Sequence, residues 1–169
     1  MTERVLSRIE LLTAAAVVAI IAVIAVPGLL RSRMSGNEAA AIGSLRAIVS
    51  AETAYASACG RNRYAPAFAT LGLPAPGGGE PYLPPELAVA VPELNGYRFT
   101  LSAAAGAIAG PADCNGTPTT TGYYATAVPI RYLKSGGRSF AVDTAGTIWQ
   151  NPSAAAPYEP FAAPSTPIQ

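Results

Sequence analysis

Residues able to do chemistry are few in this sequence of 169 residues. It contains no histidine, and its only aspartates are Asp113 and Asp143. The lack of histidine excludes Ser-His and Cys-His nucleophiles and histidine metal sites. The two cysteines form no CxxC or CxxCH pattern for zinc, redox chemistry or covalent haem, and no clustered carboxylates indicate a calcium loop or a glycosidase pair. The sequence therefore predicts a protein that is not an enzyme and has no cofactor.

The carboxylate in the most unusual setting is Glu10. It stands immediately before LLTAAAVVAIIAVIAVPGLL, the segment from Leu11 to Leu30, which carries no charged residue. An ionised carboxylate entering a membrane is costly unless it finds a partner. Two interpretations are open at this point. Glu10 and Arg8 mark the interfacial edge of a membrane span, or Glu10 pairs with a positive group on a neighbouring subunit.

The apolar segment has the length of a membrane span. As a helix, it extends about 30 Å, the thickness of the hydrocarbon layer of a bilayer. A secretory signal peptide fits less well, because its apolar core is shorter and ends in a small-residue cleavage site. We expect residues 9–30 to span a membrane, with the N-terminus in the cytoplasm because the downstream features are typical of an extracytoplasmic domain. A plain signal anchor for a periplasmic domain shares the apolar run and is the alternative.

The segment SRIELLTAAAVVAIIAVIAVPGLLRSRMSGNEAAAIGSLRAI resembles the N-terminal helix of type IV pilins and type II secretion pseudopilins. Glu10 stands at the place of the family's nearly invariant glutamate, and Pro27 at that of its helix-kinking proline. Weaker similarity continues through AETAYASACGRNRYAPAFATLG, GYRFTL and RSFAVDTAGTIW to a Pro-rich end. The resemblance implies a filament subunit whose glutamate neutralises the N-terminal amine of an adjacent subunit during assembly.

Three positions depart from the family pattern. Val5 stands where the family's leader peptidase requires glycine, Leu6 replaces the usual phenylalanine, and Arg8 is closer to the glutamate than is common. Either a leader preceded this chain or its N-terminal residues are retained. In both cases we expect the partner of Glu10 to be the N-terminal amine, Arg4 or Arg8 of a neighbouring subunit.

Pro27 and Gly28 weaken the predicted helix. Proline lacks an N–H, and its ring collides with the carbonyl four residues earlier, so a kink or a melted turn is predicted between Val23 and Gly28. Backbone groups loosened in this way need protein neighbours, which a filament core could supply. A merely kinked transmembrane helix is the alternative.

The remainder of the chain predicts an α+β fold. Apolar residues recur at steps of three and four over 31–58, which indicates an amphipathic helix: Met34, Ala41, Ile42, Leu45, Ile48, Val49, Tyr55 and Ala56. Its apolar stripe requires a sheet, and we expect the helix of residues 1–58 to pack by its second half on a small antiparallel sheet within residues 59–169, as in pilins.

Alternating residues identify the strands of that sheet. Tyr97, Phe99 and Leu101 form one run, Tyr124, Thr126 and Val128 a second, and Phe140 and Val142 lead through a turn at 143–146 into residues 147–149. Pro129 indicates an edge strand or a strand end. Residues 59–96 predict a long irregular loop with one short helical turn near 66–71. The Pro-rich tail, 151–169, is expected to lie extended on the surface or on a neighbouring subunit.

The two cysteines and a threonine-rich patch are candidate modification sites. Cys59 follows the helix and Cys114 lies between the first two strand candidates. An exported domain meets oxidising conditions and has an even cysteine count, so we predict a disulfide, with two buried free thiols as the alternative. Asn115 begins an N-glycosylation sequon, and Thr119 and Thr120 are candidates for O-linked sugars.

The prediction for the whole chain is a structural subunit of an extracellular type IV pilus-like filament. It would polymerise with copies of itself from an inner-membrane pool, with the help of pilus assembly machinery. A type II secretion pseudopilin and a non-polymerising, membrane-anchored periplasmic binding module are the alternatives. The net charge of +1 and the lack of any block of like charges give no sign of a nucleic-acid partner.

Overall fold

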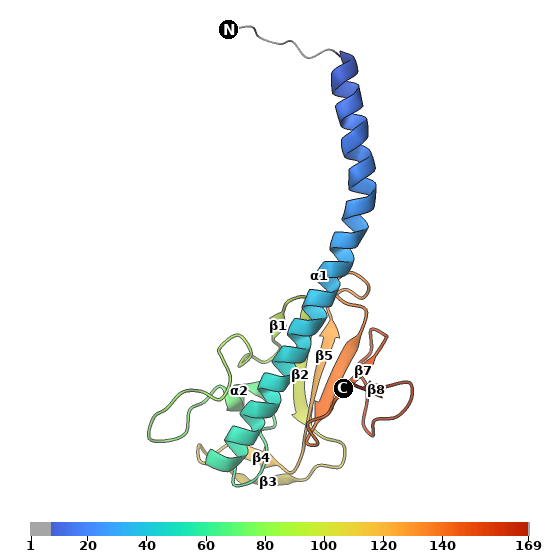
Figure 1. The fold of residues 1–169 in the computed structure, drawn as a ribbon. Coiled ribbons are helices and arrows are strands. Elements are labelled where there is room, and N and C mark those ends of the chain that lie inside the picture. Colours follow the sequence, from blue (N-terminus) through green and yellow to red (C-terminus); the bar gives the residue numbers. More distant parts are fainter. Residues whose placement is uncertain (1–7, 169) are drawn as a thin grey trace. The chain divides into compact units, whose positions relative to one another are not determined.

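A computed structural model describes residues 8–168 of the chain. By compactness the chain divides into two units, Met1–Arg33 and Met34–Gln169. Helix α1, Arg8–Ala58, contributes to both units (Figure 1). The predicted boundary lay after residue 58, at the end of the helix. Residues 34–58 belong to the same compact unit as 59–169, because this half of α1 supplies one side of the core.

The second unit is built on an antiparallel sheet, so the α+β prediction is confirmed. The main sheet has six strands in the order β1-β2-β5-β6-β7-β8. Their bounds are β1 Glu93–Leu94, β2 Tyr97–Ala103, β5 Tyr123–Pro129, β6 Ser139–Asp143, β7 Ile148–Asn151 and β8 Thr166–Pro167. Strands β3, Ala109–Ala112, and β4, Pro118–Thr120, form a separate antiparallel pair. The short helix α2, Phe68–Leu71, is the helical turn predicted within the long loop.

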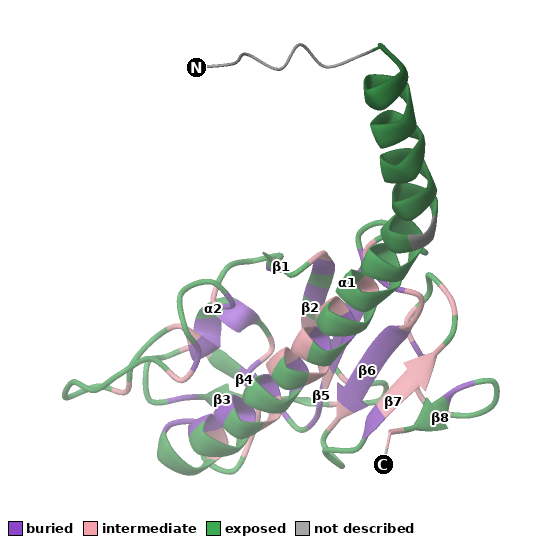
Figure 2. Ribbon diagram, turned by 45° about the horizontal axis from the view of Figure 1, so that its top comes forward, coloured by how far each residue is buried: buried purple, intermediate pink, exposed green. Residues whose placement is uncertain are grey.

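One side of α1 in this unit is buried against the sheet. Figure 2 shows buried residues along it, while the opposite side is exposed. The buried residues alternate at steps of three and four, which keeps them on one side of a helix: Glu38, Ala41, Leu45, Ile48, Glu52, Tyr55 and, just past the helix end, Cys59. Full burial of one large apolar side chain contributes about 1.5–3 kcal/mol. This stripe therefore holds α1 on the sheet.

The two central strands contribute different kinds of side chain to that core. Tyr97 and Phe99 of β2 are completely buried, as their alternation predicted. The residues of β5 that enter the core are Tyr123, Ala125 and Ala127. The run recognised in the sequence, Tyr124, Thr126 and Val128, lies on the other face of β5, because alternate side chains of a strand point to opposite faces. Pro129 ends β5, which is an interior strand of the sheet.

The Pro-rich tail covers part of that other face. Phe161 stacks on Trp149, with ring centroids 5.3 Å apart, and lies 6.2 Å from the ring of Tyr124. The Tyr124 hydroxyl donates a hydrogen bond to the carbonyl of Pro157. The tail also supplies β8, which the sequence analysis did not predict because a two-residue strand shows no alternation. The tail thus lies on the surface of its own sheet.

No melted turn interrupts the helix where a kink or melted turn was predicted. Residues 23–28 are helical, with Pro27 inside α1. A melted turn is therefore not part of this single chain. The prediction that regular hydrogen bonding is lost between Val23 and Gly28 in the assembled form stays a prediction.

Cys59 and Cys114 form the predicted disulfide, and the alternative of two free thiols is wrong. The bridge joins the residue after α1 to the loop between β3 and β4. Beside it, the Tyr55 hydroxyl donates to Oδ2 of Asp113 at 2.7 Å, and Oδ1 of Asp113 accepts from the N–H of Thr117 at 2.8 Å. These bonds fix the loop to the end of the helix.

Replacing both cysteines by serine should lower the free energy of unfolding by about 4 kcal/mol, because the bridge closes a loop with a sequence separation of 55 and so restricts the unfolded chain. Urea unfolding in detergent, followed by the fluorescence of Trp149, measures this. Wild-type protein treated with reductant should unfold like the double variant. An unchanged midpoint in the double variant would show that the bridge does not stabilise the domain.

Candidate functional site

Residues 9–30 of α1 carry large apolar side chains on every side of the helix. The solvent-exposed fractions of the large apolar residues described in this segment range from 53% to 74%. These residues are Ile9, Leu11, Leu12, Val17, Val18, Ile20, Ile21, Val23, Val26, Leu29 and Leu30. These positions do not repeat at the helical period, so no polar side exists to face water. A helix that is apolar all round belongs in a membrane or inside an assembly. This segment is the candidate functional site.

By length and composition, α1 is able to cross a membrane. None of its most apolar stretch is buried by the part of the chain that the structure describes. Contiguous apolar surface of this size is uncommon on soluble monomers and marks a site of membrane or protein interaction. The structure therefore supports the expected transmembrane segment to this extent: α1 contains an exposed apolar stretch long enough to span a membrane.

The predicted assembly residues are spread along this helix instead of forming a pocket. Arg8 and Glu10 lie in the first turns of α1 and are exposed, and Pro27 and Gly28 lie near the end of the apolar segment. A Cβ atom added to Gly28 would meet nothing within 4 Å. The predicted positions that fall outside the described residues are Arg4, Val5 and Leu6.

The predicted glycosylation sites differ in their exposure to solvent. Asn115 is exposed. Thr119 and Thr120 are each only 3% exposed, and their hydroxyls donate to the carbonyls of Pro111 and Gly122. A sugar on either threonine would require β4 to leave the fold, so the structure argues against this part of the prediction.

Two buried acids on the helix stripe were missed by the sequence analysis. Glu38 accepts hydrogen bonds from the Arg138 guanidinium at 2.6 and 2.9 Å and from the Gly137 N–H at 2.8 Å. Arg138 also donates to Oε1 of Gln150, and its carbonyl accepts from the Tyr97 hydroxyl. Glu38 thereby ties α1 to the start of β6.

Glu52 is the second buried acid, and it has no cation beside it in the described part of the chain. Its Oε2 accepts a hydrogen bond from the Ala65 N–H at 2.9 Å, while Oε1 is buried without a hydrogen-bond partner. Burial raises the pKa of Glu52 to about 8, and the Ala65 bond opposes this only in part. Glu52 is therefore protonated at neutral pH. Its place in the three-and-four spacing was the signal that could have identified it.

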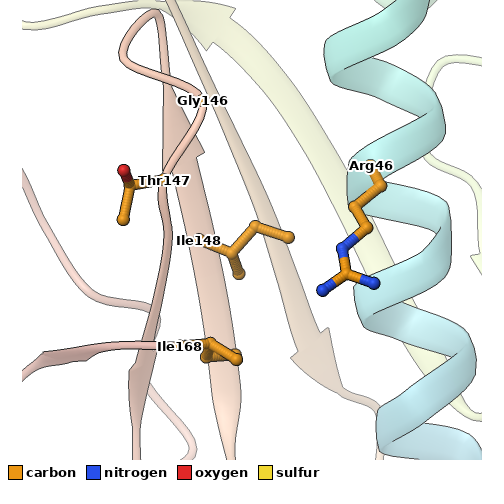
Figure 3. A pocket seen from close by; sticks show the side chains of 5 residues that line it. All are labelled: Arg46, Gly146, Thr147, Ile148 and Ile168. Carbon is orange, nitrogen blue, oxygen red and sulfur yellow. The ribbon is translucent and has the colours of Figure 1, made fainter.

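A pocket of about 260 Å³ lies between α1 and the end of the sheet. It is lined by Arg46, Gly146, Thr147, Ile148 and Ile168. Figure 3 shows the Arg46 side chain extending toward the side of Ile148. One cation and one hydroxyl among aliphatic side chains supply no set of catalytic groups. Within residues 8–168, no group of three or more His, Cys, Asp or Glu side chains could hold a metal ion.

No protein-family model, curated protein or solved structure matches this chain. The apolar helix segment, its flanking charges and the folded unit attached to it are thus the features from which a function can be inferred.

The free energy of unfolding should fall as the pH rises from about 4.5 to about 8. In the folded state Glu52 gives up its proton only near its pKa of about 8, whereas in the unfolded chain it does so near pH 4.5. The contribution of Glu52 to stability is therefore fully present below pH 4.5 and is lost as the pH rises through 8. Urea titrations at several pH values in this window measure the slope.

The Glu52→Gln variant cannot ionise and should remove most of that slope. Glu80→Gln, which changes an exposed acid, serves as the control and should retain it. Equal slopes in the wild type and the Glu52→Gln variant would contradict a buried, protonated Glu52.

Proposed function

We propose that this chain is the structural subunit of an extracellular type IV pilus-like filament. The apolar part of α1 holds it in the inner membrane before assembly, and copies then pack their helices together. One observation carries the proposal: residues 11–30 are apolar all round and are not buried by the part of the chain that the structure describes, while the rest of the same helix forms one side of a folded domain. A membrane covers such a surface first, and neighbouring copies cover it afterwards.

Two features favour polymerisation over simple anchoring. An anchor requires only the apolar run, whereas this run begins beside the acid Glu10 and contains Pro27 near its end. The resemblance to type IV pilins includes both positions. Helix-breaking residues within a span are tolerated where protein neighbours satisfy the freed backbone groups, and the helices of a filament core are such neighbours.

Glu10 would then act in the contact between copies. A carboxylate enclosed in a water-poor core carries a large desolvation penalty unless a cation and hydrogen bonds satisfy it. The candidates are the N-terminal amine, Arg4 and Arg8 of a neighbouring copy. Arg8 is two residues from Glu10 and faces a different side of its own helix, which favours pairing between copies over pairing within one.

The folded unit has features of a domain that is stable outside the cytoplasm. Its disulfide between Cys59 and Cys114 is of the kind that persists in oxidising compartments. The six-stranded sheet and the helix stripe form their own core. The unit can therefore stay folded while the apolar segment passes from lipid into protein.

The variants Glu10→Ala and Glu10→Gln should abolish or sharply reduce filament yield, while membrane insertion and the fold of the second unit stay intact. The reason is that either change removes the charge that recruits a neighbour's cation. Filaments sheared from cells expressing equal amounts of protein provide the measurement. Glu86→Gln, a change at an exposed acid of the folded unit, is the control and should assemble normally.

The Arg8→Ala variant identifies the partner. It should resemble Glu10→Ala only if Arg8, and not the amine, is the cation. Normal filament yield from Glu10→Ala would return Glu10 to the role of an interfacial charge and remove it from assembly.

In the assembled form, the helix should lose regular hydrogen bonding between Val23 and Gly28, although these residues are helical in the single chain. Pro27 removes one backbone donor, and neighbouring helices can satisfy what a melted turn exposes. A filament map at side-chain resolution shows whether this happens. A continuous, unkinked helix through Pro27 in that map would refute it.

A further inference from the structure

The connection between β5 and β6 exposes apolar side chains beside cations. Ile130 is 41% exposed and Leu133 is 65% exposed, and Arg131 and Lys134 between and after them are exposed as well. Residues 130–138 contain no acidic residue. Residues 130–134, the basic loop, therefore present a surface that is both positive and apolar.

Hydrogen bonds hold this basic loop in one shape. The Ser135 hydroxyl accepts from the N–H of Arg131 and donates to its carbonyl, both at 3.0 Å. The Leu133 N–H donates to the carbonyl of Gly136 at 2.8 Å, and the Tyr132 hydroxyl donates to the carbonyl of Pro152 at 3.0 Å. The exposed side chains are thus presented by an ordered backbone.

Leu133 is exposed and also has a strained backbone conformation. Its φ is +60°, in the left-handed region that bulky side chains seldom adopt. A glycine or asparagine would relieve this strain, and a polar residue would remove the apolar exposure. Strained backbone that holds an unusual side chain is commonly found at functional surfaces. The position is therefore better suited to a contact than to the stability of the folded unit.

The basic loop is attached to α1 just beyond the apolar segment. The Asn37 amide donates to the carbonyl of Ser135 at 2.9 Å, and Glu38 accepts from the N–H of Gly137 at 2.8 Å. The chain between Leu30, where the apolar segment ends, and Asn37 cannot reach more than about 25 Å even when fully extended. If residues 9–30 cross a membrane, the loop is held near the surface of that membrane.

We propose that the basic loop, residues 130–134, binds the anionic lipid headgroups of the membrane that α1 crosses. Arg131 and Lys134 would contact lipid phosphates, and Leu133 and Ile130 would enter the boundary between headgroups and acyl chains. Cations next to apolar side chains are the combination that anionic membrane surfaces attract. This inference rests on the membrane-held state in the proposed function, but it does not require that filaments form.

A fluorescent reporter at the loop tests the inference. Ile130→Cys is labelled with an environment-sensitive dye in the full-length, oxidised protein, whose native cysteines are bridged. The protein is reconstituted into phosphatidylcholine vesicles with and without phosphatidylglycerol. We expect dye emission to rise several-fold and shift to the blue when phosphatidylglycerol is present, and the increase to shrink at high salt because charges are then screened.

Charge variants identify the residues responsible. Arg131→Glu with Lys134→Glu should abolish the response to phosphatidylglycerol, whereas Arg46→Glu with Arg61→Glu, a matched change at two exposed cations elsewhere in the unit, should preserve it. Leu133→Gly should lower the response while raising the urea midpoint of unfolding, since it relieves the strained backbone. A lower urea midpoint would assign Leu133 to the stability of the fold and overturn its role in membrane contact.

Vesicle flotation separates the possible failures. A chain that floats with the vesicles but shows equal emission in both lipid mixtures overturns the loop inference and leaves the membrane-held state in place. A chain that does not float overturns both. Emission that depends on the ratio of protein to lipid, and not on phosphatidylglycerol, would assign the loop to contacts between copies and equally overturn the inference.

Discussion

The exposed apolar surface of α1 is the constraint on which the rest of this protein depends. Its first part, residues 9–30, has no side suited to water, and the part of the chain that the structure describes does not cover it. Each large side chain left in water forgoes about 1.5–3 kcal/mol of burial. A surrounding of lipid or of other helices recovers that free energy. A chain that passes from a membrane into a packed assembly has its apolar segment covered first by lipid and then by the helices of other copies.

The second part of the same helix meets this requirement within its own chain. Its stripe of buried residues lies on β2, β5 and β6, and the disulfide at Cys59 fixes its end. The two acids on the stripe are accommodated in different ways. Glu38 forms an ion pair with Arg138 and also accepts a hydrogen bond from Gly137 in the β5–β6 connection. Glu52 has no cation beside it among the described residues, and burial raises its pKa so that it holds its proton. The folded unit is thus complete without residues 9–30.

Local sequence patterns were sufficient to predict much of this architecture. The end of α1, the alternation in β2, the turn before β7 and the disulfide all follow from neighbouring residues or from composition. The inward face of β5 could not be predicted in this way, because the core residues Ala125 and Ala127 are small and the larger side chains beside them lie on the other face. Strand β8 and the pairing of Glu38 with Arg138 depend on partners distant in the sequence. The apolar segment was evident from the sequence because it needs no internal partner.

Electron microscopy of material sheared from the cell surface tests the central claim most directly, when combined with identification of the chain by mass spectrometry. We expect filaments that contain this chain as their principal subunit, with the disulfide between Cys59 and Cys114 intact. A chain confined to the membrane fraction, with no filaments in the sheared material at normal expression, would contradict polymerisation and support a membrane-anchored binding module.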